Sequence, residues 1–329
     1  MQTANIILAG FGHVGHAFFR LIAEKRPLLL DRYDLDLSVQ AVIRSRGGRV
    51  STEGLEGDLS DIHWDPGVKL ENALRNLKPG VFVEALPSRL QTGEPALSAI
   101  RRALGSGWHV VAASKGPLVT DFQGLNSLAR GRQVEFRYSA ATGAALPTID
   151  VGRKSLAGAD VLKMEGILNG TSNFILTRMT EGLDYASSLA EAQSRGIAEP
   201  DPSQDVGGWD SAAKLVIIAN TILETSYGLE DVQVGSIADF LKFAIGRAKA
   251  EGKKMKLLAR LCRRGESCSL KVAPEVIDAS HPLFGVDGTE KGIAFTTDSM
   301  GTLVLTGGKS DPRGAAAALL KDMIGIYTP

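Results

Sequence analysis

The sequence predicts an α/β protein in which a domain with a parallel sheet is followed by an α+β domain with a mixed sheet. Three observations support this fold class. Residues 4–22 read as a buried strand, a glycine-rich turn and an amphipathic helix. Apolar strands and helical patterns then alternate as far as residue 138, which is typical of a parallel sheet covered by helices. After residue 159, several strands follow one another through short turns, which favours antiparallel pairing.

The composition is that of an ordered globular protein. The chain has 329 residues, enough for two domains, and its 44% hydrophobic residues are sufficient for a normal core. The formal net charge is zero, which argues against a nucleic acid or an anionic membrane surface as the main partner.

The location expected from the sequence is the cytoplasm. Cys262 and Cys268 form neither a disulfide framework nor a metal-binding spacing, so we expect two reduced thiols. No apolar run is long enough for a transmembrane helix. The chain begins with a strand and has no basic segment before it, so we expect no signal peptide.

A glycine-rich turn follows the first strand and opens the first helix. Gly10 permits a tight turn, Gly12 allows the backbone to approach a pyrophosphate, and Gly15 allows the helix to pack closely on the strand. His13 and Val14 lie between them, in the first turn of the helix, where amide groups favour a bound anion. The alternative is a turn without a ligand, but the strand-turn-helix context favours a dinucleotide site that includes these five residues.

The second strand, residues 37–43, ends in a basic turn. An NAD site usually carries an acidic residue here, which binds the ribose hydroxyl groups. This chain instead has Arg44 and Ser45, which suit a 2′-phosphate. We therefore predict NADP as the cofactor, with NAD as the alternative. If no ligand binds here, the segment is a solvated basic loop.

Further strands and helices place more residues at the same edge of the sheet. We expect strands over 81–85, 108–113 and 133–138, and helices over 68–77, 94–104 and 118–129. Ligands of such sheets bind beyond the carboxyl ends of the strands. Ser88 and Lys115 follow two of these ends, so both are predicted to contact the cofactor.

The second region begins after a turn of small residues, 139–147. We expect strands over 161–168, 254–262, 268–274, 291–297 and 301–306, and helices over 174–180, 185–195, 215–223 and 313–326. Between two of the helices lies an acidic, turn-rich stretch, residues 196–214, which is poorly suited to a core and well suited to a polar small molecule.

Lysines are the candidates for proton transfer in a hydride-transfer reaction. The sequence has no His-x-x-x-His and no cysteine pair at ligand spacing, and zinc is not needed if a lysine moves the proton. Lys115 and Lys214 are those candidates. Asp210 and Lys214 are four residues apart, which is also the spacing of an ordinary ion pair on the surface of a helix. Asp205 has the alternative role of a helix N-cap. Glu199 could instead be a solvated loop residue with no part in the reaction.

Two blocks of the sequence resemble the homoserine dehydrogenase family. Residues 166–176, Gly-Ile-Leu-Asn-Gly-Thr-Ser-Asn-Phe-Ile-Leu, are similar to its substrate-domain motif. Residues 191–214 are similar to its signature block, and Ser114-Lys115 falls where the family carries Asn-Lys. The resemblance covers nearly the whole chain.

The resemblance implies a fold, a reaction and an assembly. The fold would be a Rossmann NAD(P)-binding domain, residues 1–140 completed by 307–329, and a catalytic and dimerisation domain, residues 141–306. The reaction would be the reversible NAD(P)-dependent interconversion of L-homoserine and L-aspartate 4-semialdehyde. The protein would be a homodimer, without the C-terminal ACT regulatory domain of some members.

The resemblance also implies roles for the residues. Lys214 would pass a proton to or from the substrate oxygen, and Lys115 would orient that oxygen. Glu199 and Asp210 would bind the substrate ammonium group. The substrate carboxylate would be bound by the turn that contains Asn169, Gly170 and Thr171.

Two departures from the family pattern leave alternatives open. Ser139 stands where many members have a glutamate near a monovalent cation, so a sodium site would depend on the carbonyl groups of Thr142 and Ala144. Residues 307–313 replace a glycine- and alanine-rich run of the family. The alternatives are therefore an oxidoreductase for another small hydroxy acid, or a catalytically silent NADP-binding protein.

Overall fold

The computed structural model describes residues 1–59, 64–87, 89–238, 242–265, 267–308 and 311–328. It divides into two compact units, one formed by Met1–Ala145 with Asp311–Pro329 and the other by Leu146–Ser310. Within the described residues, no helix combines the length and the hydropathy needed to cross a bilayer.

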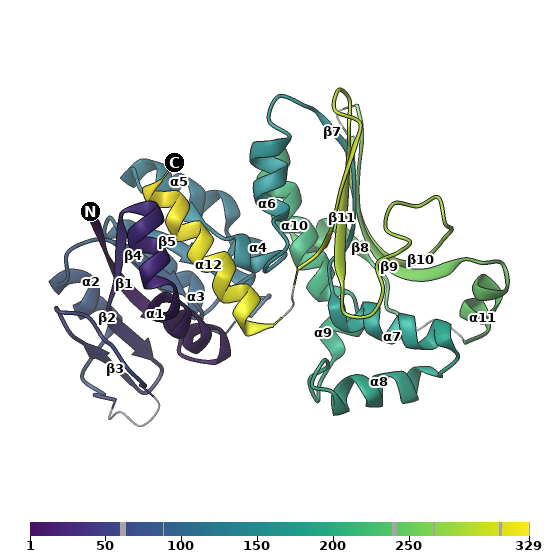
Figure 1. Ribbon diagram of the computed structural model, residues 1–329. Helices are drawn as coiled ribbons and strands as arrows, with labels where there is room; N and C mark the ends of the chain where they lie inside the picture. The colour runs from purple at the N-terminus through teal and green to yellow at the C-terminus, as the bar shows by residue number, and fades with distance from the viewer. Residues whose placement is uncertain (60–63, 88, 239–241, 266, 309–310, 329) are drawn as a thin grey trace. The chain divides into compact units, whose positions relative to one another are not determined.

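The first unit is built on a six-stranded sheet in the order β3-β2-β1-β4-β5-β6 (Figure 1). The strands are β1 (Gln2–Ala9), β2 (Leu35–Arg44), β3 (Gly47–Val50), β4 (Val81–Glu84), β5 (His109–Ala112) and β6 (Phe136–Arg137). All neighbouring pairs are parallel except β2 and β3, which form an antiparallel hairpin. The sequence prediction treated β3 as a loop, because Gly47 and Gly48 are unfavourable strand residues.

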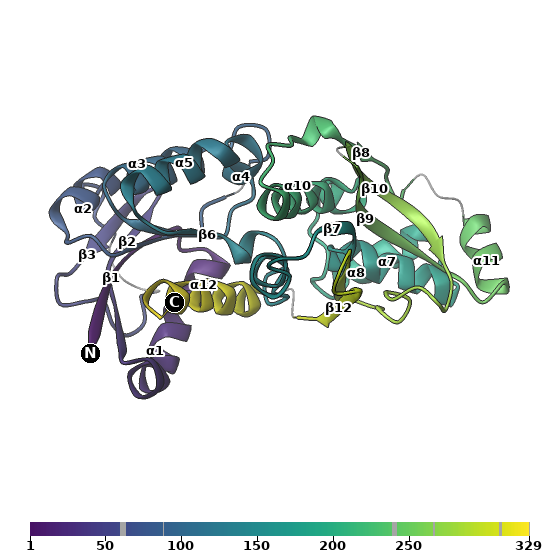
Figure 2. The same cartoon turned by 90° about the horizontal axis from the view of Figure 1, so that it is seen from above.

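Helices cover both faces of this sheet. They are α1 (His13–Tyr33), α2 (Leu70–Asn76), α3 (Ala96–Gly105), α4 (Gly116–Thr120), α5 (Phe122–Arg132) and α12 (Pro312–Tyr327). Figure 2 shows α1 and α12 on one face and α3 and α5 on the other. The single helix predicted over 118–129 is divided at Asp121, whose ψ of 52° is not helical, so α4 and α5 are separate.

The C-terminal helix completes the core of the first unit. Leu319 and Met323 of α12 are fully buried in the same cluster as Ile6 and Leu8 of β1. Asp322 is also buried, and its two carboxylate oxygens accept hydrogen bonds of 2.8 Å from the backbone N–H and the hydroxyl of Ser139. A buried polar contact of this kind fixes the orientation of α12 as well as its attachment.

The second unit contains a six-stranded mixed sheet in the order β12-β11-β7-β9-β10-β8. Its strands are β7 (Val161–Ile167), β8 (Val232–Val234), β9 (Lys254–Arg264), β10 (Ser267–Ile277), β11 (Lys291–Thr297) and β12 (Thr302–Gly307). Four of the five neighbouring pairs are antiparallel, and only β8 and β10 are parallel. The predicted α/β fold class with a mixed second sheet is confirmed.

The helices of the second unit place the polar residues of the candidate site. They are α6 (Thr148–Asp150), α7 (Gly170–Glu181), α8 (Tyr185–Ser194), α9 (Ser203–Val206), α10 (Trp209–Leu223) and α11 (Lys242–Ala250). Figure 1 shows α7 and α8 side by side, and α10 packs against β9 and β10. The elements α6, α9 and β8 were not predicted, because each is too brief to show a periodic pattern. The helix α11 was not predicted either.

Candidate active site

The glycine turn joins β1 to α1 as the sequence predicts. Gly10 has a φ of +94°, and a Cβ atom there would lie 2.2 Å from the carbonyl oxygen of Ala85. A Cβ atom on Gly15 would lie 2.1 Å from the carbonyl oxygen of Gly10. These two glycines are therefore required by the protein itself, because any side chain would displace backbone.

Gly12 differs from its two neighbours in the motif. A Cβ atom there would meet nothing within 4 Å, so the fold alone does not require glycine at this position. Gly12 is the N-cap residue of α1, His13 is the exposed first residue, and Val14 is partly buried behind it. The open space at the amino end of a long helix is what a bound pyrophosphate requires.

Arg44 and Ser45 are both exposed at the turn between β2 and β3. The guanidinium group of Arg44 lies over the ring of Trp64, 4.8 Å from its centroid, and the rings of Trp64 and Phe11 are 5.7 Å apart. Trp64 thus connects the basic turn to the glycine turn. Sequence reasoning missed Trp64, since a single aromatic residue in a loop belongs to no motif.

The loops after β4 and β5 carry the other predicted cofactor contacts. Lys115 is half-buried and precedes the first turn of α4. The carbonyl oxygen of Lys115 accepts a hydrogen bond from the N–H of Val119. Ser88 lies outside the described residues. Glu84, at the end of β4, is fully buried and binds Ser114. Sequence reasoning missed Glu84, because an acidic residue that ends an apolar strand reads as a solvated group.

A polar cluster in the second unit contains two of the five predicted substrate residues, Asn169 and Asp210. Asn169 is the N-cap residue of α7, and its side-chain oxygen accepts a 2.8 Å hydrogen bond from Ser172 N–H. Its amide nitrogen donates to Asp205 Oδ1 at 2.7 Å and to Asp210 Oδ2 at 2.8 Å. The motif at the start of α7 and the acidic stretch are therefore joined through one amide group.

Lys214 lies one helical turn after Asp210 on α10. Its Nζ donates to Asp210 Oδ2 at 2.6 Å and to the carbonyl oxygen of Leu168 at 2.8 Å. Both side chains of the ion pair are mostly buried, with 14% and 13% of their surface exposed. The solvated surface pair considered from the spacing is therefore not what the structure contains.

Asp205 brings a second carboxyl group to this cluster. Burial raises the pKa of Asp205, and the neighbouring charge of Asp210 raises it further, while the hydrogen bond from Asn169 and the charge of Lys214 act in the opposite direction. Two carboxyl groups beside one ammonium group leave an acidic site, which suits a substrate that carries its own ammonium group.

The remaining predicted residues are less closely connected to the cluster. Thr171 is buried, and its hydroxyl donates to the carbonyl oxygen of Ile197 at 3.0 Å, so it binds the start of the acidic stretch. Gly170 is the buried first residue of α7. The side chain of Glu199 is exposed. Its place in substrate binding stays a prediction.

The predicted cation site lies in the turn after Ser139. Thr142 is buried and Ala144 has a left-handed φ of +51°. Asp322, which binds Ser139, is 2.7 Å from the ammonium group of Lys321, and Lys321 also donates to Ser139 Oγ at 2.8 Å. The sodium site at the carbonyl groups of Thr142 and Ala144 stays a prediction.

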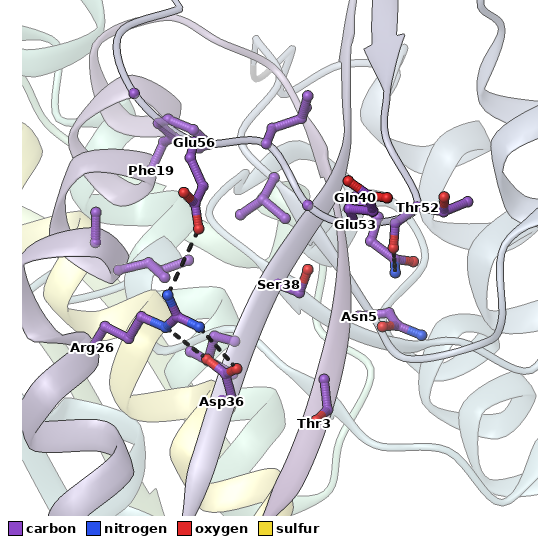
Figure 3. Close-up of a pocket in the computed structure, with 17 residues that line it drawn as sticks. Thr3, Asn5, Phe19, Arg26, Asp36, Ser38, Gln40, Thr52, Glu53 and Glu56 are labelled. Atoms are coloured by element: carbon purple, nitrogen blue, oxygen red, sulfur yellow. Dashed lines mark hydrogen bonds and ion pairs between the residues drawn. The ribbon is translucent and has the colours of Figure 1, made fainter.

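A polar pocket in the first unit lies away from the carboxyl ends of the strands. It is lined by early residues of β1 and β2, including Asp36, by α1, and by the loop 52–57. Figure 3 shows Arg26 pointing to both Asp36 and Glu56, and its guanidinium group is 3.0 Å from Asp36. Because ligands of open α/β sheets bind at the opposite ends of the strands, this pocket is not the cofactor site.

Comparisons with known proteins agree with these features. The sequence profile described as homoserine dehydrogenase matches residues 147–324, which include the whole polar cluster. The chain belongs to the homoserine dehydrogenase family. A homoserine dehydrogenase of Methanocaldococcus jannaschii is 34% identical, with 98% of each chain covered. The enzyme of Pseudomonas canavaninivorans, named as NAD(+)-dependent, is 32% identical and covers 99% of this chain and 97% of its own.

A solved structure gives the same result for the fold. A protein of Archaeoglobus fulgidus described as a homoserine dehydrogenase superimposes with a TM-score of 0.88 at 33% identity, covering 98% of this chain and 99% of its own. Homoserine dehydrogenases are oxidoreductases that act on a CH–OH group with a nicotinamide cofactor. The predicted family and enzyme class are therefore confirmed.

Proposed function

We propose that this protein catalyses the reversible NAD(P)-dependent interconversion of L-homoserine and L-aspartate 4-semialdehyde, a step of threonine, methionine and isoleucine biosynthesis. The observation that carries the proposal is the mostly buried Lys214, which Asp210 and the Leu168 carbonyl hold within a cluster that includes Asn169 and Asp205. This cluster lies inside the part of the chain that matches the family.

Lys214 is suited to move the proton of the substrate hydroxyl group. A lysine ammonium group has three hydrogens, and Asp210 and Leu168 accept two of them. The third hydrogen is available to the substrate oxygen. In the direction of aldehyde reduction Lys214 donates this proton to the carbonyl oxygen, and in the direction of alcohol oxidation the neutral amine accepts it. A nicotinamide cofactor held by the first unit would supply the hydride-transfer chemistry.

The surrounding groups orient Lys214 and the substrate. Asn169 uses both hydrogens of its amide on Asp205 and Asp210, so we assign it a positioning role beside its predicted place in substrate binding. The backbone N–H groups of Gly170 and Thr171 stand at the positive end of α7, which suits the substrate carboxylate. Asp210 and the exposed Glu199 would receive the substrate ammonium group.

Residues of the first unit would hold the cofactor. The glycine turn would bind the pyrophosphate, and Arg44 with Ser45 would bind a 2′-phosphate. We therefore propose NADP rather than NAD as the preferred cofactor. The Trp64 ring fixes one face of the Arg44 guanidinium group, so less side-chain entropy is lost when the phosphate binds. Lys115 would orient the reacting oxygen beside the nicotinamide.

A cytoplasmic homodimer completes the proposal, as the family resemblance implies. Light scattering at several protein concentrations measures the assembly, and a mass of twice 34.9 kDa is expected. A monomer at all concentrations would contradict this part of the proposal without affecting the chemistry.

The reaction is tested by following NADP reduction with L-homoserine beside a panel of other small hydroxy acids. We expect turnover with L-homoserine and faster reaction with NADP than with NAD. Strong NADP binding without any homoserine turnover would replace the proposal with a different hydroxy acid or with a silent NADP-binding protein.

A further inference from the structure

Glu84 is a fully buried carboxyl group at the end of β4, next to the loops expected to carry cofactor and substrate contacts. Its Oε1 is 2.6 Å from Leu86 N and 2.7 Å from Ser114 Oγ, and its Oε2 is 3.0 Å from Ser114 N. Leu86 follows β4, and Ser114 follows β5 and precedes Lys115. One side chain therefore joins both loops at the carboxyl edge of the sheet.

The number of hydrogens in this network bears on the protonation state of Glu84. The hydroxyl oxygen of Ser114 is 2.7 Å from Glu84 Oε1 and 2.8 Å from the carbonyl oxygen of Leu86. The Ser114 hydroxyl has one hydrogen, which it either shares between these two oxygens or gives to one of them. The Leu86 carbonyl has none to give. If the Ser114 hydrogen goes to the Leu86 carbonyl, the hydrogen between Ser114 and Glu84 comes from the carboxyl group of Glu84.

We propose that Glu84 is a neutral carboxylic acid that donates to Ser114, which in turn donates to the Leu86 carbonyl, and that it acts as a positioning residue for Lys115. This inference rests on the proposed role of Lys115 in the reaction. The two backbone N–H groups of Leu86 and Ser114 donate to the carboxyl oxygens and complete the network.

The surroundings of Glu84 agree with a neutral acid. In the part of the chain that the structure describes, the main influences on Glu84 besides its burial are hydrogen bonds from Ser114, Leu86 and Ala113, with no lysine, arginine or histidine among them. Burial raises the pKa of Glu84, and the hydrogen bonds from Ser114 and Leu86 oppose this only in part. An unpaired buried carboxylate is costly, whereas a neutral carboxyl group with all its hydrogen bonds is not.

A neutral acid bears on Lys115 through the backbone. The hydrogen-bonded network fixes the backbone of Ser114, and with it the start of the neighbouring Lys115 side chain. The network therefore positions Lys115 without placing a full negative charge at the buried end of β4.

The protonation state is measured directly by infrared difference spectroscopy of wild type and Glu84→Gln at neutral pH. We expect a carboxylic acid carbonyl band in the wild type that the variant lacks. Only carboxylate bands, with no difference at the acid position, would overturn the proposal. This readout needs no substrate, so it holds even if the protein has no activity towards homoserine.

Kinetics test the positioning role. Glutamine keeps the length of the side chain and can donate to Ser114 Oγ and accept from Ser114 N–H, but its amide nitrogen cannot accept from Leu86 N–H as Oε1 does. Glu84→Gln should therefore lower kcat by less than Glu84→Asp does and leave the pH profile unchanged. Glu84→Asp is too short to join both loops, so its kcat should fall by about tenfold or more, roughly 1.4 kcal/mol of barrier. Glu71→Gln, an exposed position on α2, is the control and should have no effect.

The outcomes separate the inference from the proposed function. If folded Glu84→Gln loses as much activity as Glu84→Asp, the carboxyl group does not act as a neutral acid and the inference fails. If the acid band is present but the wild type does not oxidise homoserine, the proposed function fails and the protonation state of Glu84 stands. Circular dichroism and thermal melting confirm that each variant is folded.

Discussion

The glycine turn of the first unit and the Asn169 cluster of the second unit, which we propose bind polar molecules, are built in different ways. The turn uses backbone: Gly10 and Gly15 are required by close approaches to carbonyl oxygens. The cluster uses charged side chains, which Asn169 joins through its amide group. Backbone sites tolerate changes of side-chain charge, whereas a network of buried charges depends on every member.

The glycine turn separates structural from functional requirements within one motif. Gly10→Ala places a Cβ atom 2.2 Å from the Ala85 carbonyl oxygen at a left-handed φ, so we expect a loss of about 2–5 kcal/mol of unfolding free energy. Gly12→Ala meets nothing within 4 Å, so the loss should be limited to the preference for glycine over alanine at an N-cap, about 1 kcal/mol or less.

Cofactor binding should rank the two glycine variants differently. Gly12→Ala places a methyl group where we propose the pyrophosphate binds, so the Kd for NADP should rise about tenfold or more in a folded protein. Denaturant unfolding and calorimetric titration measure the two effects. Normal NADP binding by Gly12→Ala would remove the pyrophosphate from this turn.

Asn169 tests whether the side-chain cluster works as a network. Asn169→Ala releases Asp210 and Asp205, and we expect kcat to fall about ten- to a hundredfold, since small displacements of reacting groups are costly. Asn169→Asp keeps a helix-capping oxygen but cannot donate, and it brings a third carboxyl group to Asp205 and Asp210, so it should lose as much activity and also some stability. Steady-state kinetics with Asn126→Ala as the control checks this, and an active Asn169→Asp would reduce Asn169 to a helix cap.

Arg44 tests cofactor choice through charge. Arg44→Asp removes the group proposed to bind the 2′-phosphate and introduces a carboxylate that suits ribose hydroxyl groups. The ratio of kcat/KM for NADP to that for NAD should fall by about tenfold or more, at unchanged kcat. Arg49→Asp, an exposed position on β3, is the matched control. Equal ratios in the two variants would mean that Arg44 does not read the phosphate.

The smallest expected effect is that of Asp205 on the thermal stability of the protein. The pKa of Asp205 is raised in the folded protein, so the folded state binds the proton more readily than the unfolded chain, and this carboxyl group weakens the fold as pH rises above its ordinary pKa. Asp205→Asn should raise Tm by about 1–3 °C at neutral pH, and the gain should vanish near pH 4. Asp201, whose pKa is lowered by Ser203, should give no gain when changed to Asn.

The two regions also differ in how far the sequence could predict them. The glycine turn was predicted residue by residue, because glycine spacing between a strand and a helix has few physical explanations. Lys214 and Asp210 were predicted as a pair, and their burial was not, because burial depends on how α10 packs against β9 and β10. Glu84 and Trp64 could not be predicted, because their partners lie 30 and 20 residues away in Ser114 and Arg44.

The central claim is that Lys214 moves the substrate proton, and the kinetics of Lys214→Ala with L-homoserine and NADP test it most directly. Lys253→Ala is the matched control, because Lys253 also pairs with an acidic residue but lies at the surface. We predict that kcat falls about 10²- to 10⁴-fold in Lys214→Ala with little change in KM, and stays unchanged in Lys253→Ala. A folded Lys214→Ala that keeps kcat within about tenfold of wild type, roughly 1.4 kcal/mol of barrier, would contradict the claim.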